Sequence, residues 1–201
     1  MTETINFEVD SDGIALMTID LPGRSMNVID GQFMQDLTEL IDKVVSDDAI
    51  KGAVITSGKP AFMAGADLSM MGENAGAAST GEATPEDVFN GVYAMNKQLR
   101  AMETCGKPFA AAINGLALGG GLEITLACHY RVCADDPKLT LGLPEVNVGL
   151  LPGGGGTQRL PRLMGVQAAA PYLLQGKNMS PQEAQGLGVV HEVAPRDEKP
   201  S

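Results

Sequence analysis

The chain has 201 residues, enough for one large domain with a sizeable core. Its net charge of −11 argues against nucleic acids and anionic membranes as main partners. No apolar run approaches the roughly 18 residues of a membrane helix. The polar, acidic N-terminus is unlike a secretory signal, so we expect a cytoplasmic protein with no membrane span.

The three cysteines, Cys105, Cys128 and Cys133, are odd in number and have no Cys-x-x-Cys spacing. We expect buried thiols in a reducing compartment and no metal site. His129 follows Cys128, but the only other histidine is His191, so the pattern does not indicate zinc or a cysteine–histidine nucleophile.

The first half of the chain shows strand and helix patterns in alternation. Residues 14–21 read as a strand with 5–9 as its partner across a turn, and 52–56 read as a short buried strand. Asp30 is placed to cap a helix. The apolar stripe of that helix is Phe33, Leu37, Leu40, Ile41 and Val44. Residues 72–84, rich in small and polar side chains, favour a mobile loop.

The second half continues the alternation. The Thr84-Pro85 pair is a typical helix start, and this helix should run to about Cys105. Ser180 caps another helix, and Thr157 is expected to cap a short one that Pro161 disturbs; Pro171 predicts a kink or early end of a further helix. The remaining predictions are strands at 109–113, 130–134 and 189–193 and helices at 122–128 and 166–174. Strands alternating with helices indicate an α/β fold.

Two glutamates in glycine-rich surroundings are the main candidates for chemistry. Glu123 ends the run Gly-Gly-Gly-Leu-Glu, and Glu145 follows Leu-Pro shortly before four consecutive glycines. A predicted helix, strand and turn lie between them, so the chain can double back and bring both carboxyl groups together. Two carboxyl groups in a partly dry pocket can differ in protonation, as acid–base chemistry on a water molecule requires.

The glycines before Glu123 add a second element. Gly120 and its neighbours follow a strand and open a helix, where unpaired N–H groups can bind an oxygen that becomes negative during a reaction. The alternative is structural: the glycines permit tight packing, and Glu123 is a solvated first-turn residue. Each motif alone leaves both interpretations open, and the two together favour function.

These motifs resemble the crotonase (enoyl-CoA hydratase/isomerase) superfamily, from about residue 5 to 195. The matching segments, in order, are AFMAGADL at 61–68, INGLALGGGLE at 113–123, LGLPE at 141–145 and GLLPGGGGTQRL at 149–160. Within the family, the pattern is most similar to the N-terminal hydratase modules of multifunctional fatty-acid oxidation proteins. The resemblance implies an α/β spiral of repeated β-β-α units, usually in homo-oligomers or with other β-oxidation subunits.

The resemblance also implies roles for individual residues. It makes Glu123 and Glu145 the acid–base pair and places the oxyanion-binding N–H groups on Ala66 and Gly120. Arg24 matches a position near the phosphates of coenzyme A, although a surface arginine in a turn is equally compatible. Asp67, which belongs to the same site, could alternatively cap the next turn. The segment implied to line the coenzyme A site is Ala64, Gly65, Ala66, Asp67 and Leu68.

The implied reaction is hydration of a 2-enoyl-CoA to 3-hydroxyacyl-CoA in fatty-acid β-oxidation. The acyl-CoA thioester is the substrate, so coenzyme A is part of it and no separate cofactor is expected. The alternatives are a Δ3-Δ2 enoyl-CoA isomerase and a truncated, non-catalytic module that binds coenzyme A or serves assembly. Family members usually continue through further C-terminal helices. We therefore expect a hydratase domain at 1–195, a polar tail or linker at 196–201, and missing C-terminal helices.

Overall fold

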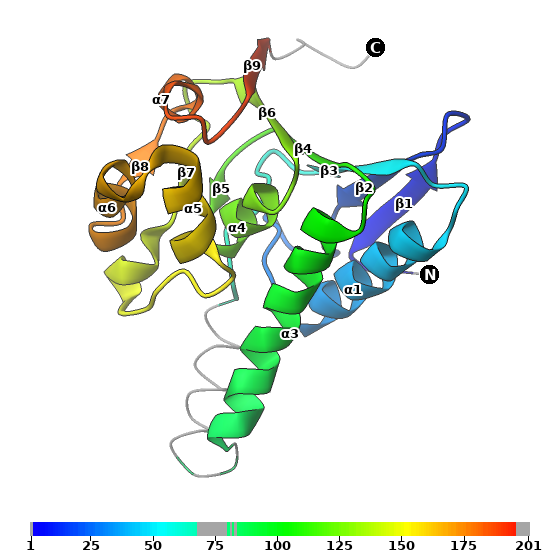
Figure 1. The fold of residues 1–201 in the computed structure, drawn as a ribbon, viewed down its shortest axis with the longest axis horizontal. Coiled ribbons are helices and arrows are strands. Elements are labelled where there is room, and N and C mark those ends of the chain that lie inside the picture. Colours follow the sequence, from blue (N-terminus) through cyan, green and yellow to red (C-terminus); the bar gives the residue numbers. More distant parts are fainter. Residues whose placement is uncertain (1, 68–79, 81, 83, 196–201) are drawn as a thin grey trace.

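The computed structural model describes residues 2–67, 80, 82 and 84–195. Its main sheet has the strand order β1-β2-β3-β4-β6-β9. Strand β1 pairs antiparallel with β2, and every later pairing in this sheet is parallel (Figure 1). The strands are β1 (Ile5–Val9), β2 (Ile14–Ile19), β3 (Gly52–Ser57), β4 (Phe109–Ile113), β6 (Tyr130–Asp135) and β9 (Glu192–Pro195).

A second, smaller sheet has the order β5-β7-β8. Its strands are two residues each: β5 (Ala117–Leu118), β7 (Leu141–Gly142) and β8 (Asn178–Met179). Strand β5 directly precedes the glycines that open α4 (Gly120–Leu126), and β7 directly precedes the segment with Glu145. This small sheet therefore brings the two predicted acid–base segments together.

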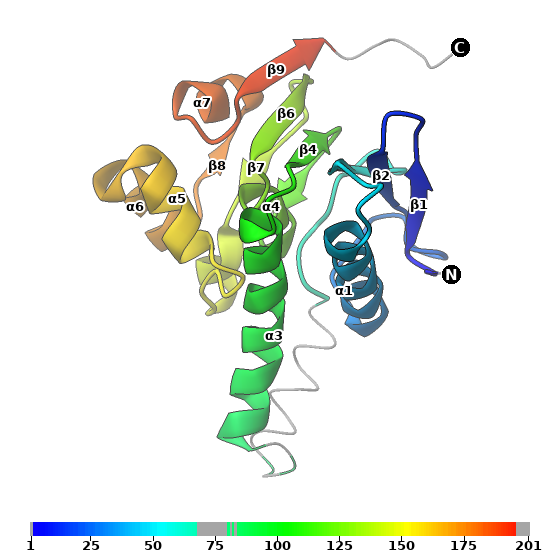
Figure 2. The ribbon, with the colours of Figure 1, turned by 45° about the vertical axis from the view of Figure 1, so that its right-hand side comes forward.

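Two long helices, α1 (Gly31–Ser46) and α3 (Pro85–Thr104), pack against each other beside the main sheet (Figures 1 and 2). The N-terminal half of α3 projects beyond the body of the molecule. The shorter helices gather around the small sheet; they are η1 (Pro144–Val148), a 3-10 helix, and α5 (Gly156–Met164), α6 (Val166–Leu174) and α7 (Pro181–Gly186).

Local signals placed most elements correctly and confirm the α/β class. The Asp30 carboxylate accepts the Phe33 N–H at 2.9 Å, as expected for the cap of α1. Thr84 caps α3 in a reciprocal capping box with Asp87. The Ser180 hydroxyl accepts the Glu183 N–H at 3.2 Å and caps α7.

Two predictions at the C-terminal end were wrong, the Thr157 cap and the start of the last strand, and one of the two outcomes predicted for Pro171 is not observed. Thr157 lies inside α5, whose cap is Gly155 with φ of +99°, and Pro161 does not end that helix. Helix α6 runs to Leu174 through Pro171, so the early end is not observed. The last strand begins at Glu192, not at 189, because Val189 N–H bonds to Ala184 O in the turn after α7.

The core is built mainly from aliphatic side chains, with Phe33, Phe62 and Phe109 as its fully buried aromatics. Cys128 and Cys133 are buried as expected, whereas Cys105 is only partly buried. Across the described ranges, no helix combines the length and apolarity needed to cross a membrane. Most of the predicted loop at 72–84, residue Leu68 and the predicted tail at 196–201 lie outside the described residues.

Candidate active site

The turn into α4 depends on a glycine whose backbone conformation is rarely adopted by residues that carry a side chain. Gly119 has φ of +54°, and its N–H donates to Gly142 O at 2.9 Å, which ties the turn to β7. A Cβ added to Gly119 would lie 2.9 Å from Glu145 Oε1. The absent side chain is therefore what lets the Glu145 carboxylate approach the start of α4.

The segment 63–66 runs against the same turn. Leu118 N–H donates to Met63 O at 3.0 Å, and Ile29 N–H donates to Gly65 O at 2.8 Å. Gly65 has φ of +99°, and a Cβ there would lie 3.7 Å from the Gly120 nitrogen. Two stretches far apart in sequence thus place their backbones side by side at the N-terminus of α4.

The N–H groups of Ala66 and Gly120 are available to a ligand. Gly120 is the first residue of α4, where an N–H has no partner within the helix. Within the described part of the chain, neither N–H donates a hydrogen bond to a protein acceptor. Both belong to the adjoining stretches just described, and two donors that share one oxygen must come from backbones that lie close together.

Glu123, in the first turn of α4, is almost completely buried, with 2% of its surface exposed. Its Oε1 accepts the Gly156 N–H at 2.7 Å. Burial raises the pKa of Glu123 from 4.5 to about 7, and the negative charge of Glu145 acts in the same direction. The backbones of Gly156 and Gly154 and the charge of Arg159 oppose this rise without cancelling it.

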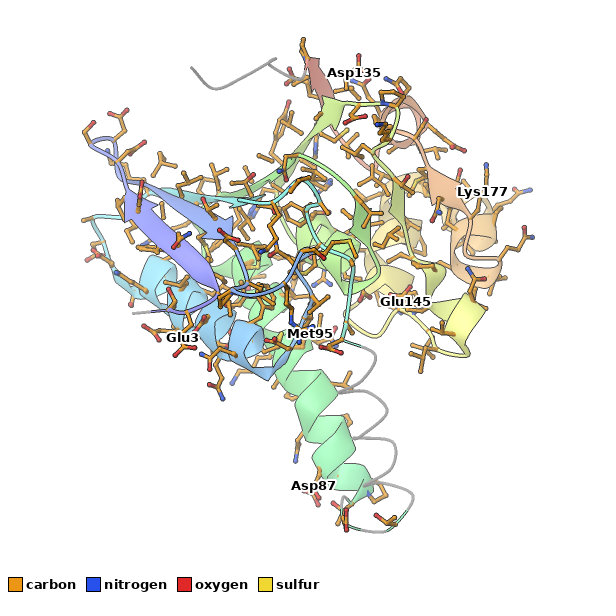
Figure 3. The ribbon with its side chains drawn as sticks, turned by 180° about the vertical axis from the view of Figure 1, so that it is seen from behind. Glu3, Asp87, Met95, Asp135, Glu145 and Lys177 are labelled. Carbon is orange, nitrogen blue, oxygen red and sulfur yellow. The ribbon has the colours of Figure 1, made fainter. Side chains whose placement is uncertain are left out.

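Glu145 stands in the first turn of η1 and is partly buried (Figure 3). Burial raises its pKa above the ordinary value, while its own backbone N–H acts against the rise. Among the described residues, its Oε2 is buried and meets no hydrogen-bond donor. A buried carboxylate oxygen without a partner is costly, so this atom is free to bind a polar ligand such as water.

The two glutamates therefore meet at one place. Glu145 touches the Gly119 position, and the Glu123 N–H donates to Gly119 O at 3.0 Å. The negative charge of Glu145 raises the pKa of Glu123, so the two carboxyl groups lie close enough to interact. At neutral pH a carboxyl group with a pKa of about 7 is poised to give or take a proton beside a second carboxyl group.

Two of the predicted coenzyme A residues form an ion pair, namely Arg24 in the segment after β2 and Asp67 in the segment after β3. Arg24 Nη2 lies 2.8 Å from Asp67 Oδ2 and 3.9 Å from Asp30 Oδ2. Arg24 is 45% exposed, so its guanidinium still faces solvent. Ala64 N–H donates to Asn27 O at 2.9 Å, which fixes the start of the loop. Leu68, the last member of the predicted set, lies outside the described residues.

Several contacts around Glu123 were not expected from the sequence. A Cβ on Gly154 would lie 2.6 Å from Glu123 Oε2 and 2.7 Å from Met95 Cε, so the glycine run leaves room for the carboxylate and for α3. Figure 3 shows Met95 where α3 meets the body, far from Asp87 on the projecting half. The glycine run itself was visible, but nothing local indicates that residues 154–156 face Glu123.

The chain matches one family over most of its length. A model of the family described as enoyl-CoA hydratase/isomerase matches residues 10–199. The fatty acid oxidation complex subunit alpha of Shewanella baltica (strain OS185) is 45% identical over 199 residues, covering 98% of this chain and 27% of that protein. The same subunit of Shewanella frigidimarina (strain NCIMB 400) is 44% identical over 196 residues, covering 97% and 26%. The chain thus spans about a quarter of the length of these relatives.

Solved structures agree with this match. An enoyl-CoA hydratase from Bacillus anthracis superposes with a TM-score of 0.81 and 32% identity, covering 96% of this chain and 70% of that one. An enoyl-CoA hydratase from Thermoplasma volcanium GSS1 gives a TM-score of 0.82 at 29% identity, covering 96% and 72%. The crotonase-like fold is therefore confirmed, and the chain belongs to the enoyl-CoA hydratase/isomerase family.

Proposed function

We propose that this chain adds water to 2-enoyl-CoA thioesters and forms 3-hydroxyacyl-CoA. The observation that carries the proposal is the meeting of two partly or fully buried carboxyl groups, Glu123 and Glu145, beside the Gly119 turn. Hydration needs one group that takes a proton from water and one that supplies a proton to carbon. A pair of carboxyl groups with raised pKa values can provide both near neutral pH.

In this mechanism the thioester oxygen accepts hydrogen bonds from the Ala66 and Gly120 N–H groups. Negative charge grows on that oxygen as water attacks C3, and donors that are already oriented stabilise it without reorganisation. Removal of one such donor typically costs about 3–4 kcal/mol in the barrier. The adjoining positions of Gly65 and Gly120 support the placement of both donors on one oxygen.

The proton steps balance across the C2=C3 bond. One carboxylate takes a proton from the water as the water oxygen bonds to C3. The other carboxyl group, which is protonated, gives its proton to C2. The product gains one hydroxyl group and one hydrogen atom, and proton exchange with solvent resets the pair. The unpartnered Oε2 of Glu145 supports its role in holding the water.

The coenzyme A moiety is proposed to lie along the loop of Ala64, Gly65, Ala66 and Asp67, with Leu68 beyond it. Arg24 is the basic residue on this side, and its charge is already shared with Asp67. A phosphate would therefore bind Arg24 on its exposed side or compete with Asp67 for the guanidinium. The fatty acid oxidation relatives support β-oxidation as the setting.

The proposal is tested with the purified chain and crotonyl-CoA, by following the loss of ultraviolet absorbance of the enoyl thioester. Glu123→Gln and Glu145→Gln should each lower the rate by about two orders of magnitude or more while the protein stays folded. Glu39→Gln, which removes an exposed carboxylate from α1, is the matched control. A near-wild-type rate for either site variant would remove that residue from the mechanism.

The same proteins should be offered 3-enoyl-CoA. A hydratase consumes the 2-enoyl substrate, whereas a Δ3-Δ2 isomerase converts the 3-enoyl substrate and leaves the 2-enoyl thioester without added water. Tight binding of coenzyme A with no turnover of either substrate would contradict both enzymatic assignments and support a binding module. Gly120→Val gives a further check, because a Cβ there would meet Ile29 Cδ1 at 2.5 Å and disturb the donor position. Its rate should fall, and unchanged kinetics would place the oxyanion site elsewhere.

A further inference from the structure

A partly buried ion pair between Arg159 and Glu103 lies near enough to Glu123 for the charge of Arg159 to act on that carboxyl group. Arg159 of α5 donates from Nε to Glu103 Oε1 at 2.7 Å and from Nη2 to Glu103 Oε2 at 3.2 Å. The two side chains are 12% and 23% exposed. This two-point contact fixes the plane of the guanidinium, which a single hydrogen bond would not do.

The third donor of Arg159 holds the glycine run. Arg159 Nη1 donates to Gly154 O at 2.8 Å, and Asn96 of α3 donates to Gly153 O at 2.8 Å. Both contacts fasten the residues 153–154 to side chains on or bound to α3. The run continues directly into Gly156, the first residue of α5.

The same glycine run, residues 153–156, also contacts the Glu123 carboxylate. Gly156 N–H donates to Glu123 Oε1, and the space where Gly154 would carry a Cβ is within 2.6 Å of Glu123 Oε2. A shift of the run by a fraction of an ångström would therefore move both contacts of the carboxylate. Misplacement of a reacting group by about 1 Å can lower the rate about 100-fold.

We infer that Arg159, held by Glu103, is a positioning residue that sets residues 154–156 against Glu123 and so orients its carboxylate. The catalytic meaning of this inference rests on the proposed hydration mechanism. Neither Arg159 nor Glu103 is assigned a proton in that mechanism, so both act only through the glycine run and through the field at Glu123.

Arg159 also acts on Glu123 through its charge. The charged groups that influence it are Glu145 of η1, which raises its pKa, and Arg159 of α5, which lowers it. Burial alone would raise the pKa of Glu103, but hydrogen bonds from Arg159 and Arg100 hold it below its usual value. Glu103 therefore stays ionised at neutral pH and keeps Arg159 in place.

The test compares Arg159→Met, Arg159→Lys and Glu103→Gln with Arg162→Met in the full 201-residue chain. Arg162 lies on the same helix and donates only to Gln158 among the described residues, so its variant controls for loss of charge. The first readout is a carbon NMR titration of labelled glutamate carboxyl groups. The resonance that titrates near the pKa of about 7 is assigned to Glu123 by its absence in Glu123→Gln.

We expect Arg159→Met to move the titration midpoint of Glu123 upward and to lower kcat for crotonyl-CoA about tenfold or more, with KM within about twofold. Arg159→Lys keeps the charge but cannot reproduce the two-point contact. Arg159→Lys should therefore bring the titration midpoint of Glu123 closer to the wild-type value than it brings kcat. Glu103→Gln should lower kcat in the same way, and Arg162→Met should change neither readout.

The inference is overturned if Arg159→Met folds and keeps the wild-type titration midpoint of Glu123 and the wild-type kcat. If Arg159→Met does not fold, the same result for both Arg159→Lys and Glu103→Gln overturns it. It is also overturned if Arg162→Met causes the same changes, because the effect would then be one of net charge. A wild-type chain without hydratase activity would refute the proposed function instead. The NMR midpoint would still decide in that case whether Arg159 and Glu103 control Glu123.

Discussion

Replacement of Glu123 by glutamine should make the protein more stable at pH 8 while it removes hydratase activity. The carboxyl group is 2% exposed, and burial raises its pKa from 4.5 to about 7. The unfolded chain therefore ionises this group at a lower pH than the folded chain does. The resulting stability is fully present below pH 4.5 and is lost as the pH rises towards and through about 7.

The size of this effect follows from the two pKa values. At about 1.4 kcal/mol per pKa unit, the difference between 4.5 and about 7 corresponds to about 3 kcal/mol at pH 8. That is a large part of the roughly 5–15 kcal/mol that stabilises a typical protein. Glutamine keeps an oxygen that can accept the Gly156 N–H and carries no charge, so it lacks this pH-dependent cost.

The assay is urea unfolding, followed by circular dichroism at several pH values between 4 and 9. The free energies of unfolding of wild type and Glu123→Gln should agree within about 1 kcal/mol near pH 4. They should diverge to about 3 kcal/mol in favour of the variant at pH 8, which is roughly 10 °C in Tm for a chain of this size. Glu145 is present in both proteins, so the comparison isolates the loss of the Glu123 charge together with its repulsion by Glu145.

Glu39→Gln, which removes an exposed carboxylate, should follow the wild-type pH dependence. Parallel curves for wild type and Glu123→Gln would refute the reasoning, because they would mean that Glu123 ionises equally easily in both states. A variant that is less stable at every pH would show that glutamine cannot satisfy its amide hydrogens in this pocket.

Three further changes have outcomes that the contacts predict. Asp36→Ala should lower the free energy of unfolding by about 2–4 kcal/mol near neutral pH, because the carboxylate accepts hydrogen bonds from Glu3 N–H and from the Thr4 N–H and hydroxyl. Burial alone would raise the pKa of Asp36, but these bonds hold it below 3.8. The difference in free energy of unfolding between wild type and Asp36→Ala, measured with urea, should therefore shrink as the medium is acidified through that lowered pKa. A difference that stays constant with pH would contradict this. Gly154→Ala should reduce kcat on crotonyl-CoA about 100-fold with little change in melting temperature, because its Cβ would meet Glu123 Oε2 at 2.6 Å; wild-type turnover would mean that the carboxylate is not confined there. Gly115→Ala should cost about 3 kcal/mol in thermal unfolding, since its Cβ would need to lie 1.9 Å from the Pro60 backbone oxygen, and an unchanged Tm would show that this loop can move.

Local patterns were sufficient where the physical cause is local. Asp30 and Thr84 cap their helices through hydrogen bonds three residues along the chain, so their short side chains and the following apolar spacing predicted α1 and α3. Strands β2, β3 and β4 of the main sheet were similarly visible because they are runs of five or six mainly apolar residues. The two-residue strands of the small sheet carry no such pattern, because their pairing depends on partners far along the chain.

Local chemistry was misleading where a tertiary contact decided the outcome. Thr157 is a good cap by itself, yet α5 begins at Gly156, whose N–H is taken by the distant Glu123 carboxylate. The ion pair of Arg24 with Asp67, at 2.8 Å, was likewise not predicted from the sequence, and their proposed place beside coenzyme A stays a prediction. In both cases the deciding partner is more than thirty positions away, so no local spacing indicates it.

The sequence by itself determined the family, the α/β class and the two candidate carboxyl groups, because these depend on residue types in ordered motifs and on local periodicity. Only the tertiary structure decided how Glu123 behaves. Its pKa depends on which groups exclude water from it and which charges and N–H groups face it. Those neighbours, Gly156, Arg159 and Glu145, come from other elements of the chain, and only folding brings them to the same few ångströms of space.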